Sequence, residues 1–347
     1  MDGQDSLSEI AQLKTRLQSV HLPTDLFTKA NEQIERIGLS LKYGGNLAQL
    51  DITAKYIDWI VSLPWEAKTE DILDVKKAKE VLDKNHFGLE KIKQRVLEYL
   101  SLLILQREKL NMTSFHAPSL FFTGLVGTGK TTFARSVAEA LGRKFVRIPF
   151  GGLSSALDLR GQSKTSPEAE PGMIIKALRR AGSNNPVILL DELDRISPEA
   201  RASIMGVLIE LLDPDQNINF TDYFIDYPFA LTQALFIATA NNTTSISTAV
   251  MDRLEVIQMP AYTDEEKIAI AKNFVLPRYL KESGLTATNL QFADGAWEKI
   301  ARPLGFDAGI RTLERTIEGI VRKVAYKMVN GEGASFTIDE NNLKEYL

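Results

Sequence analysis

The chain has 347 residues, which at about 150 residues per domain predicts two or three domains rather than one. Hydrophobic residues make up 44% and charged residues 25% of the sequence. This is close to ordinary globular usage and excludes collagen-like and disordered classes. Lys and Arg number 41 against 45 Asp and Glu, a net charge of −4, so no whole-chain basic field attracts nucleic acid or an acidic membrane.

The sequence contains no cysteine and three histidines, His21, His86 and His116. The absence of cysteine excludes disulfides, thiolate zinc sites and cysteine nucleophiles, and the histidines are too scattered to indicate a metal cluster. No apolar run approaches the roughly 18 residues that a membrane span needs, and the first residues lack the pattern of a signal peptide. We therefore expect a cytoplasmic protein without membrane contacts.

The first 69 residues have the apolar spacing of helices. Apolar residues recur at intervals of three and four from Ile10 to Val20, and a second periodic stretch covers residues 26–37. A third runs from about residue 46 to Leu63, where Pro64 ends it. We predict an amino-terminal helical segment, a helical hairpin or short coiled coil, over residues 1–69.

Short apolar runs alternate with segments of helical period between residues 70 and 260. A helix is predicted over 88–110, and five runs are strand candidates: 119–123, 144–148, 187–190, 235–239 and 255–259. Buried parallel strands have continuous apolar sequences because helices cover both faces of the sheet. The pattern predicts a doubly wound α/β domain over residues 70–260.

Residues 261–347 return to helical periodicity. Helices are predicted over 264–284, 294–304 and 309–329, with a short strand at 334–338. This region forms a separate α-helical domain in our prediction.

The clearest motif is GxxxxGK[ST], which falls directly after the first strand candidate and before a predicted helix. Glycines let backbone N–H groups turn inward around a polyphosphate, and the helix N-terminus adds positive charge. Lys130 is expected to reach the β and γ phosphates of ATP, and Thr131 to coordinate Mg²⁺. A chance glycine turn is the alternative, which the flanking strand and helix argue against. The predicted binding residues are Gly124, Leu125, Val126, Gly127, Thr128, Gly129, Lys130, Thr131 and Thr132.

A second apolar run ends in two carboxylates, Asp191 and Glu192. Ligands of open α/β sheets bind at the carboxyl ends of the strands. Asp191 is expected to hold Mg²⁺, through water, and Glu192 to polarise the attacking water. A strand ending in Asp-Glu is common and can be a solvated loop start, but here it follows a phosphate loop in the same domain.

Two further polar residues flank predicted strands, one after a strand and one before the next. Asn241 follows the apolar run 235–239 and could orient water against the γ phosphate. Arg253 lies just before the next run. Arg253 has two open roles, one structural and one in which it acts in trans on the nucleotide of a neighbouring subunit.

Together these segments resemble the AAA+ ATPase module of the Lon protease family over nearly the whole chain. SLPW and LDPDQN are far more specific than the phosphate loop, which many unrelated ATPases share. The matching segments are SLPW (62–65), NHFGL (85–89), the phosphate loop, LLDELD (189–194), LDPDQN (212–217), FIATAN (236–241), DRLEV (252–256) and GIRTLER (309–315).

The resemblance implies a role for several residues. Asn241 corresponds to sensor 1, Arg253 to the arginine finger and Arg311 to sensor 2 of a helical lid domain, while His86 and Phe87 fall where the family lines its adenine pocket. Alternatives stay open: Arg311 can pair with Glu314 on the helix surface, and the His86 ring can pack while its backbone meets adenine. The resemblance also implies ATP hydrolysis in a homohexameric ring, protein substrates, a role in protein quality control and an associated Ser-Lys peptidase domain.

Two features depart from the family pattern. The aromatic-hydrophobic-Gly step that grips substrate in the central pore falls on Ser166, Pro167 and Glu168, which cannot stack on a polypeptide. The peptidase domain would follow the lid, and the chain ends at Leu347, so no peptidase activity is expected from this chain.

Three functions follow from these observations. The first is an ATPase module that couples hydrolysis to remodelling or translocation of a protein for a Lon-like protease. The second is a nucleotide-gated assembly or scaffold ATPase without threading activity. The third, a nucleic-acid motor, is disfavoured by the acidic balance and the lack of a basic stripe with interleaved aromatic residues.

Overall fold

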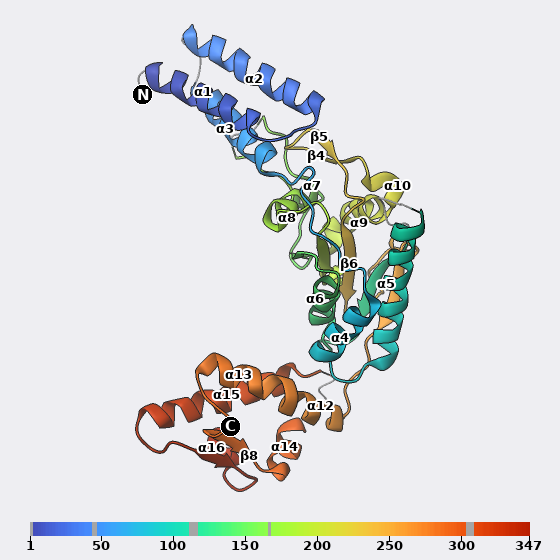
Figure 1. Cartoon of the computed structure of the whole chain (residues 1–347), viewed down its shortest axis with the longest axis vertical. Helices are drawn as coiled ribbons and strands as arrows, with labels where there is room; N and C mark the ends of the chain where they lie inside the picture. Colours follow the sequence, from blue (N-terminus) through green and yellow to red (C-terminus); the bar gives the residue numbers. More distant parts are fainter. Residues whose placement is uncertain (1–2, 44–46, 111–116, 166–167, 303–308) are drawn as a thin grey trace. The chain divides into compact units, whose positions relative to one another are not determined.

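The computed structural model describes residues 3–43, 47–110, 117–165, 168–302 and 309–347 (Figure 1). It divides into two compact units. The first comprises residues 1–73, 101–121 and 141–256, and the second comprises residues 74–100, 122–140 and 257–347. Within the described residues, no helix is long and apolar enough to cross a membrane.

The amino-terminal segment consists of three helices, as predicted. They are α1 (Gly3–Gln18), α2 (Thr24–Lys42) and α3 (Leu47–Ser62), and α1 and α2 lie side by side (Figure 1). Their apolar faces bury Leu17, Leu26, Ile34 and Ile57 in a hydrophobic cluster that continues into the α/β part of the first unit. Because this core is shared, the helices are part of the unit rather than a detached coiled coil.

The central sheet has the strand order β2-β3-β6-β1-β7. Its five strands match the five predicted apolar runs to within one residue: β1 (Ser119–Thr123), β2 (Phe145–Pro149), β3 (Val187–Asp191), β6 (Leu235–Ala240) and β7 (Leu254–Gln258). β2 pairs in parallel with β3, and β3 with β6, with Val187 opposite Leu235. Every residue of β1, β3 and β6 is buried, which explains their continuous apolar sequences.

Helices precede and connect these strands. In chain order they are α4 (Val75–Asn85), α5 (Glu90–Leu110), α6 (Lys130–Ala140), α7 (Leu157–Arg160), α8 (Met173–Ala181), the 3₁₀ helix η1 (Leu193–Arg195), α9 (Pro198–Leu212), α10 (Pro214–Asn217) and α11 (Thr248–Met251). Helix α8 packs on β2, and α4 packs on α6. The antiparallel hairpin of β4 (Phe220–Asp222) and β5 (Tyr227–Phe229) was not predicted.

The carboxy-terminal part of the second unit is mainly helical, as predicted. It contains α12 (Asp264–Ile270), η2 (Ala271–Val275), α13 (Leu276–Ser283), α14 (Asp294–Ala301), α15 (Arg311–Val329) and α16 (Leu343–Tyr346), with β8 (Leu290–Phe292) parallel to β9 (Phe336–Ile338). The predicted single helix over 264–284 is interrupted by the π-helical η2, next to Pro277, which lacks a backbone N–H to donate.

Candidate functional site

The phosphate loop lies in the second unit, between β1 and α6. Gly124, Gly127 and Gly129 all have positive φ, at 149°, 82° and 89°. A Cβ at Gly124 would lie 2.6 Å from the Met259 carbonyl oxygen. A side chain at Gly124 would therefore clash with the backbone, so the loop depends on glycine at this position.

Lys130 bends back over this loop at the start of α6. Its Nζ donates to the carbonyl oxygens of Gly124, at 2.6 Å, and Leu125, at 2.9 Å. The Thr132 hydroxyl and the Phe133 N–H both donate to the Gly129 carbonyl, at 2.7 Å and 2.8 Å. The ammonium group is thus held over the loop, where a polyphosphate would meet it.

Residues of the carboxy-terminal region contact the phosphate loop inside the same unit. The Tyr262 hydroxyl donates to the Thr128 carbonyl at 3.2 Å, and the Ile310 N–H donates to the Gly127 carbonyl at 3.1 Å. Arg311, the first residue of α15, is exposed beside Gly127. Tyr262 was not predicted from the sequence, because a lone tyrosine after a strand has no motif.

The predicted surface pair between Arg311 and Glu314 has a competitor in the structure. Glu314 accepts a hydrogen bond from Arg278 on α13 at 2.9 Å. The apolar face of α15, formed by Leu313, Ile317, Ile320 and Val324, is buried. Arg311 lies on the opposite side of α15 from this face and is exposed.

His86 and Phe87 differ in their surroundings. The His86 ring is buried, lies 4.5 Å from the Phe133 ring between centroids, and has its Nε2 2.9 Å from the Ser136 hydroxyl. Burial, with the Lys93 charge as a smaller cause, lowers the pKa of His86 to about 4. The His86 ring therefore packs against α6, while the Phe87 ring is 39% exposed.

The acidic end of β3 lies in the first unit. Asp191 is buried, and its two carboxylate oxygens accept hydrogen bonds from Arg147 Nε, at 2.5 Å, and from the Thr239 hydroxyl. Both donors come from neighbouring strands, β2 and β6, and neither was predicted from the sequence. They hold the carboxylate in one orientation.

Glu192 adopts an unusual backbone conformation for a residue with a side chain. Its φ and ψ are 61° and 51°, a left-handed conformation that costs on the order of 1–3 kcal/mol. Its N–H donates to the Thr239 hydroxyl at 3.0 Å, and its carboxylate lies 3.2 Å from Arg195. Thr239 thus contacts both Asp191 and Glu192, and such strain concentrates at functional sites.

Asn241 is held next to this acidic strand end. Its side-chain amide donates to Asp194 at 3.3 Å, and Asn242 donates to the same oxygen at 3.4 Å. Asp194 belongs to η1, three residues after Asp191 in the chain. The first unit therefore holds Asn241 against Asp194, which follows Asp191 and Glu192 at the end of β3.

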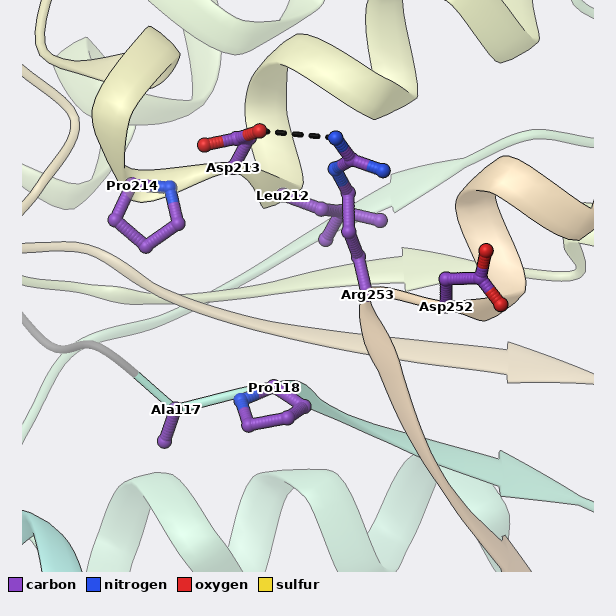
Figure 2. Close-up of a pocket in the computed structure, with 7 residues that line it drawn as sticks. All are labelled: Ala117, Pro118, Leu212, Asp213, Pro214, Asp252 and Arg253. Carbon is purple, nitrogen blue, oxygen red and sulfur yellow. Dashed lines mark hydrogen bonds and ion pairs between the residues drawn. The ribbon is translucent and has the colours of Figure 1, made fainter.

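Arg253 lines a cavity of about 390 Å³ in the first unit (Figure 2). Its guanidinium group donates to Asp213 at 2.9 Å and to the Ala249 carbonyl at 2.8 Å. Asp213 also accepts the Asp215 N–H at 3.1 Å, which caps α10. The specific LDPDQN segment thus supplies the partner of Arg253. The cavity is lined by Ala117, Pro118, Leu212, Asp213, Pro214, Asp252 and Arg253.

The loop expected at the pore is closed at its base. A Cβ at Gly161 would lie 2.7 Å from the Gly172 nitrogen and 2.9 Å from the Asp222 carboxylate. Asp222 is buried and accepts the Gly172 N–H at 2.7 Å. Ala169 is also fully buried.

The rest of this loop has exposed and undescribed positions. Glu168 is exposed, whereas Ser166 and Pro167 lie outside the described residues. Lys164 stacks over the Tyr56 ring of α3 at 4.4 Å from the ring centre. The two ends of the loop are therefore anchored to the first unit.

Comparisons with known proteins identify the class to which these domains belong. Residues 120–261 match the family of ATPases associated with various cellular activities (AAA), so the α/β domain is an AAA ATPase domain. Residues 281–336 match the Lon protease AAA+ ATPase lid domain. The chain thus combines an AAA ATPase domain with a Lon-type lid, and the predicted resemblance to the AAA+ module of the Lon protease family is confirmed.

Relatives named Lon protease match almost the entire chain. The Lon protease of Dictyoglomus thermophilum is 44% identical over 323 residues, which cover 93% of this chain and 40% of that protein. The Lon protease of Lawsonia intracellularis is 42% identical over 346 residues, covering 100% of this chain and 41% of that protein. The chain therefore spans about 40% of the length of these curated relatives.

Proposed function

We propose that this chain binds and hydrolyses ATP through its phosphate loop and the carboxylates at the end of β3. The observation that carries the proposal is the acidic strand end, where Thr239 and Arg147 fix Asp191. There Glu192 has a strained backbone bonded to Thr239, and Asn241 is held by Asp194. The strand before the phosphate loop, β1, belongs to the same sheet as β3, with β6 between them. Open α/β sheets bind ligands at the carboxyl ends of such strands.

Each residue has a distinct role in this proposal. Lys130 binds the β and γ phosphates, and Glu192 orients and polarises the attacking water. Asn241, held by Asp194, positions the same water, and Arg311 contacts phosphate from the lid. Because phosphoryl transfer depends mainly on positioning and electrostatics, fixed side chains are what the reaction needs.

The donor chemistry fits Mg²⁺. The Thr131 hydroxyl and the Asp191 carboxylate are hard oxygen donors, and magnesium usually keeps several waters and takes only one or two protein ligands. Among the described residues no group of three or more acidic or histidine side chains could hold a metal by itself. Bound magnesium would neutralise charge on the phosphate oxygens.

We further propose that Arg253 acts in trans within a homohexameric ring. Its support is an exposed cavity that presents a guanidinium group already oriented by Asp213 and the Ala249 carbonyl (Figure 2). An arginine supplied by a neighbour stabilises the charge of the transition state. We extend this proposal to a protein substrate and an associated Lon-type peptidase domain, because the matched relatives are named Lon protease.

A second function, a nucleotide-gated scaffold ATPase without threading, is favoured by the loop over residues 161–172. Ala169 is buried and Asp222 accepts the Gly172 N–H, so the end of the loop is held in place. Exposed Glu168 offers no apolar contact for a polypeptide. The two functions differ in what stimulates hydrolysis.

One comparison separates these functions. ATPase rates are measured with no addition, with an unfolded protein, and with single-stranded or duplex DNA. Stimulation by the unfolded protein alone supports the protease module, unstimulated turnover supports the scaffold, and stimulation by DNA alone contradicts both. The ATPase assignment itself would be overturned if the wild type did not hydrolyse ATP, or if Lys130→Ala hydrolysed it at the wild-type rate.

A further inference from the structure

The backbone of the lid meets the backbone of the phosphate loop at two facing glycines, Gly309 and Gly127. A Cβ built on Gly309 would lie 2.5 Å from the Gly127 carbonyl carbon and 2.6 Å from the Val126 carbonyl oxygen. These distances are well inside van der Waals contact, so any side chain at residue 309 must push the two segments apart. Gly309 is itself buried.

Backbone conformation does not explain this glycine. Gly309 has no positive φ, unlike Gly127 with its φ of 82°. Glycine is therefore required at residue 309 because a side chain has no room between the two segments. The close approach allows the next residue, Ile310, to donate its N–H to the Gly127 carbonyl at 3.1 Å.

This hydrogen bond orients a peptide of the phosphate loop. In a planar trans peptide the C=O and the following N–H point in opposite directions. Because Ile310 holds the Gly127 carbonyl on the lid side, the Thr128 N–H is directed away from the lid. Tyr262 does the same for the following peptide, since its hydroxyl holds the Thr128 carbonyl and so directs the Gly129 N–H.

The neighbouring carbonyls of the loop are held as well. Lys130 bonds to those of Gly124 and Leu125, and the first turn of α6 bonds to that of Gly129. An anion-binding loop works by aiming successive N–H groups inward. The carbonyls at Gly127 and Thr128 differ from these, since the residues that hold them come from the carboxy-terminal region.

We propose that Gly309 and Tyr262 are positioning residues that pre-organise the phosphate loop, so that the lid sets the loop's affinity for a nucleotide phosphate before any nucleotide binds. The inference rests on the proposed ATPase function and adds the means by which the lid acts on it. The same contact positions Arg311, two residues after Gly309, because α15 begins directly after it. The first turn of this helix is closed by the Glu314 N–H, which donates to the Ile310 carbonyl at 2.8 Å.

The test compares Gly309→Ala with Gly319→Ala, a matched control in α15 where an added Cβ meets nothing within 4 Å. Tyr262→Phe serves as a second variant that removes only the hydroxyl. Binding of ADP and ATP is measured by titration, and amide hydrogen exchange of residues 124–131 is measured without nucleotide. Thermal unfolding reports whether each variant is folded.

Gly309→Ala is expected to weaken nucleotide binding about tenfold or more and to raise exchange in the loop, while Gly319→Ala changes neither. Tyr262→Phe is expected to weaken binding about threefold to tenfold, as for the loss of one hydrogen bond. Wild-type binding and exchange in folded Gly309→Ala protein would overturn the inference. If Gly309→Ala does not fold, Tyr262→Phe with wild-type binding and exchange overturns it. Failure of the wild type to bind nucleotide would instead overturn the proposed function.

Discussion

The Asp213 carboxylate accepts a hydrogen bond from the Arg253 guanidinium group at 2.9 Å and at the same time caps α10 (Figure 2). The hydrogen bond from Arg253 lowers the pKa of the Asp213 carboxyl group, so the pair stays charged. Asp213 belongs to the LDPDQN segment, and Arg253, 40 positions later, directly precedes β7. LDPDQN, one of the two most specific segments of the resemblance, therefore orients the residue that we propose acts in trans.

The substitution Asp213→Asn tests this orientation. The amide side chain keeps an oxygen for the α10 cap but loses the charge that holds Arg253, so we expect ATPase activity of the assembled protein to fall on the order of tenfold. Nucleotide affinity should stay unchanged, because Arg253 does not belong to the phosphate loop. The measurement is steady-state ATPase activity, with exposed Asp215→Asn as the control. Equal rates for the two variants would contradict the role of Asp213.

Replacing Glu192 by Gln should leave ATP binding nearly unchanged and reduce turnover by orders of magnitude. Lys130, Thr131 and Asp191 hold the phosphates and the metal in our proposal, whereas Glu192 acts on the water. ATP binding and single-turnover hydrolysis measure the two effects. Glu199→Gln, an exposed carboxylate at the start of α9, provides the control. Near wild-type hydrolysis by the Glu192 variant would show that another group activates the water.

Mixing two inactive variants tests action in trans. Arg253→Ala lacks the arginine and Glu192→Gln lacks the water-orienting carboxylate, so each alone should be inactive. In mixed rings some interfaces pair an intact Arg253 with an intact Glu192, and part of the activity should return. The measurement is ATPase activity against mixing ratio, with ring formation checked by light scattering. Absence of recovery in rings that have formed argues for a role of Arg253 within its own subunit.

His86 should make the protein sensitive to mild acid. Its pKa is about 4 in the folded protein against about 6.5 in the unfolded chain. Buried, neutral His86 therefore contributes fully to the free energy of unfolding above pH 6.5. This contribution is lost as the pH falls toward 4, because only the unfolded chain then binds the proton. The loss amounts to about 3 kcal/mol.

The pH effect is measured as the difference between wild type and His86→Phe, which keeps an aromatic ring beside Phe133. Denaturant unfolding at pH 7.5 and pH 5 gives the free energy of unfolding. At pH 5 the free energy of unfolding of the wild type should be lower, relative to that of His86→Phe, than at pH 7.5. This comparison removes the opposite trend of Asp222, whose pKa burial raises to about 6 and whose contribution is lost as the pH rises from about 4 to 6. A difference independent of pH would refute the expected titration.

The loop over residues 161–172 should make the chain a poor unfoldase. Replacing Ser166, Pro167 and Glu168 by Tyr, Val and Gly supplies an apolar step and is expected to increase unfolding of a tagged reporter, since a packed aromatic contributes on the order of 1 kcal/mol. Reporter fluorescence and substrate-stimulated ATPase are measured with a Lon-type peptidase domain supplied. Ser163→Tyr, an exposed site in the same loop, is the control. Strong unfolding by the wild type would contradict the prediction.

Much of the architecture is encoded in local sequence patterns. The strands β1, β3 and β6 are continuous apolar runs because they are buried on both faces. The phosphate loop needs glycines and a lysine at fixed spacing, so its residues can be identified without a fold. The same holds for Asp191, Glu192 and Asn241, which lie at the ends of apolar strands.

The residues that hold these groups in place became visible only in the tertiary structure. Arg147, Thr239, Asp213, Tyr262 and Gly309 act through contacts with residues that are 40 or more positions away. Arg147, Thr239 and Tyr262 have no motif around them, and the motifs that contain Asp213 and Gly309 do not say which residues these contact. A partner on another strand leaves no periodic signal in the sequence. The inward packing of the His86 ring and the short β4–β5 hairpin were decided in the same way, by burial against distant segments rather than by local propensity.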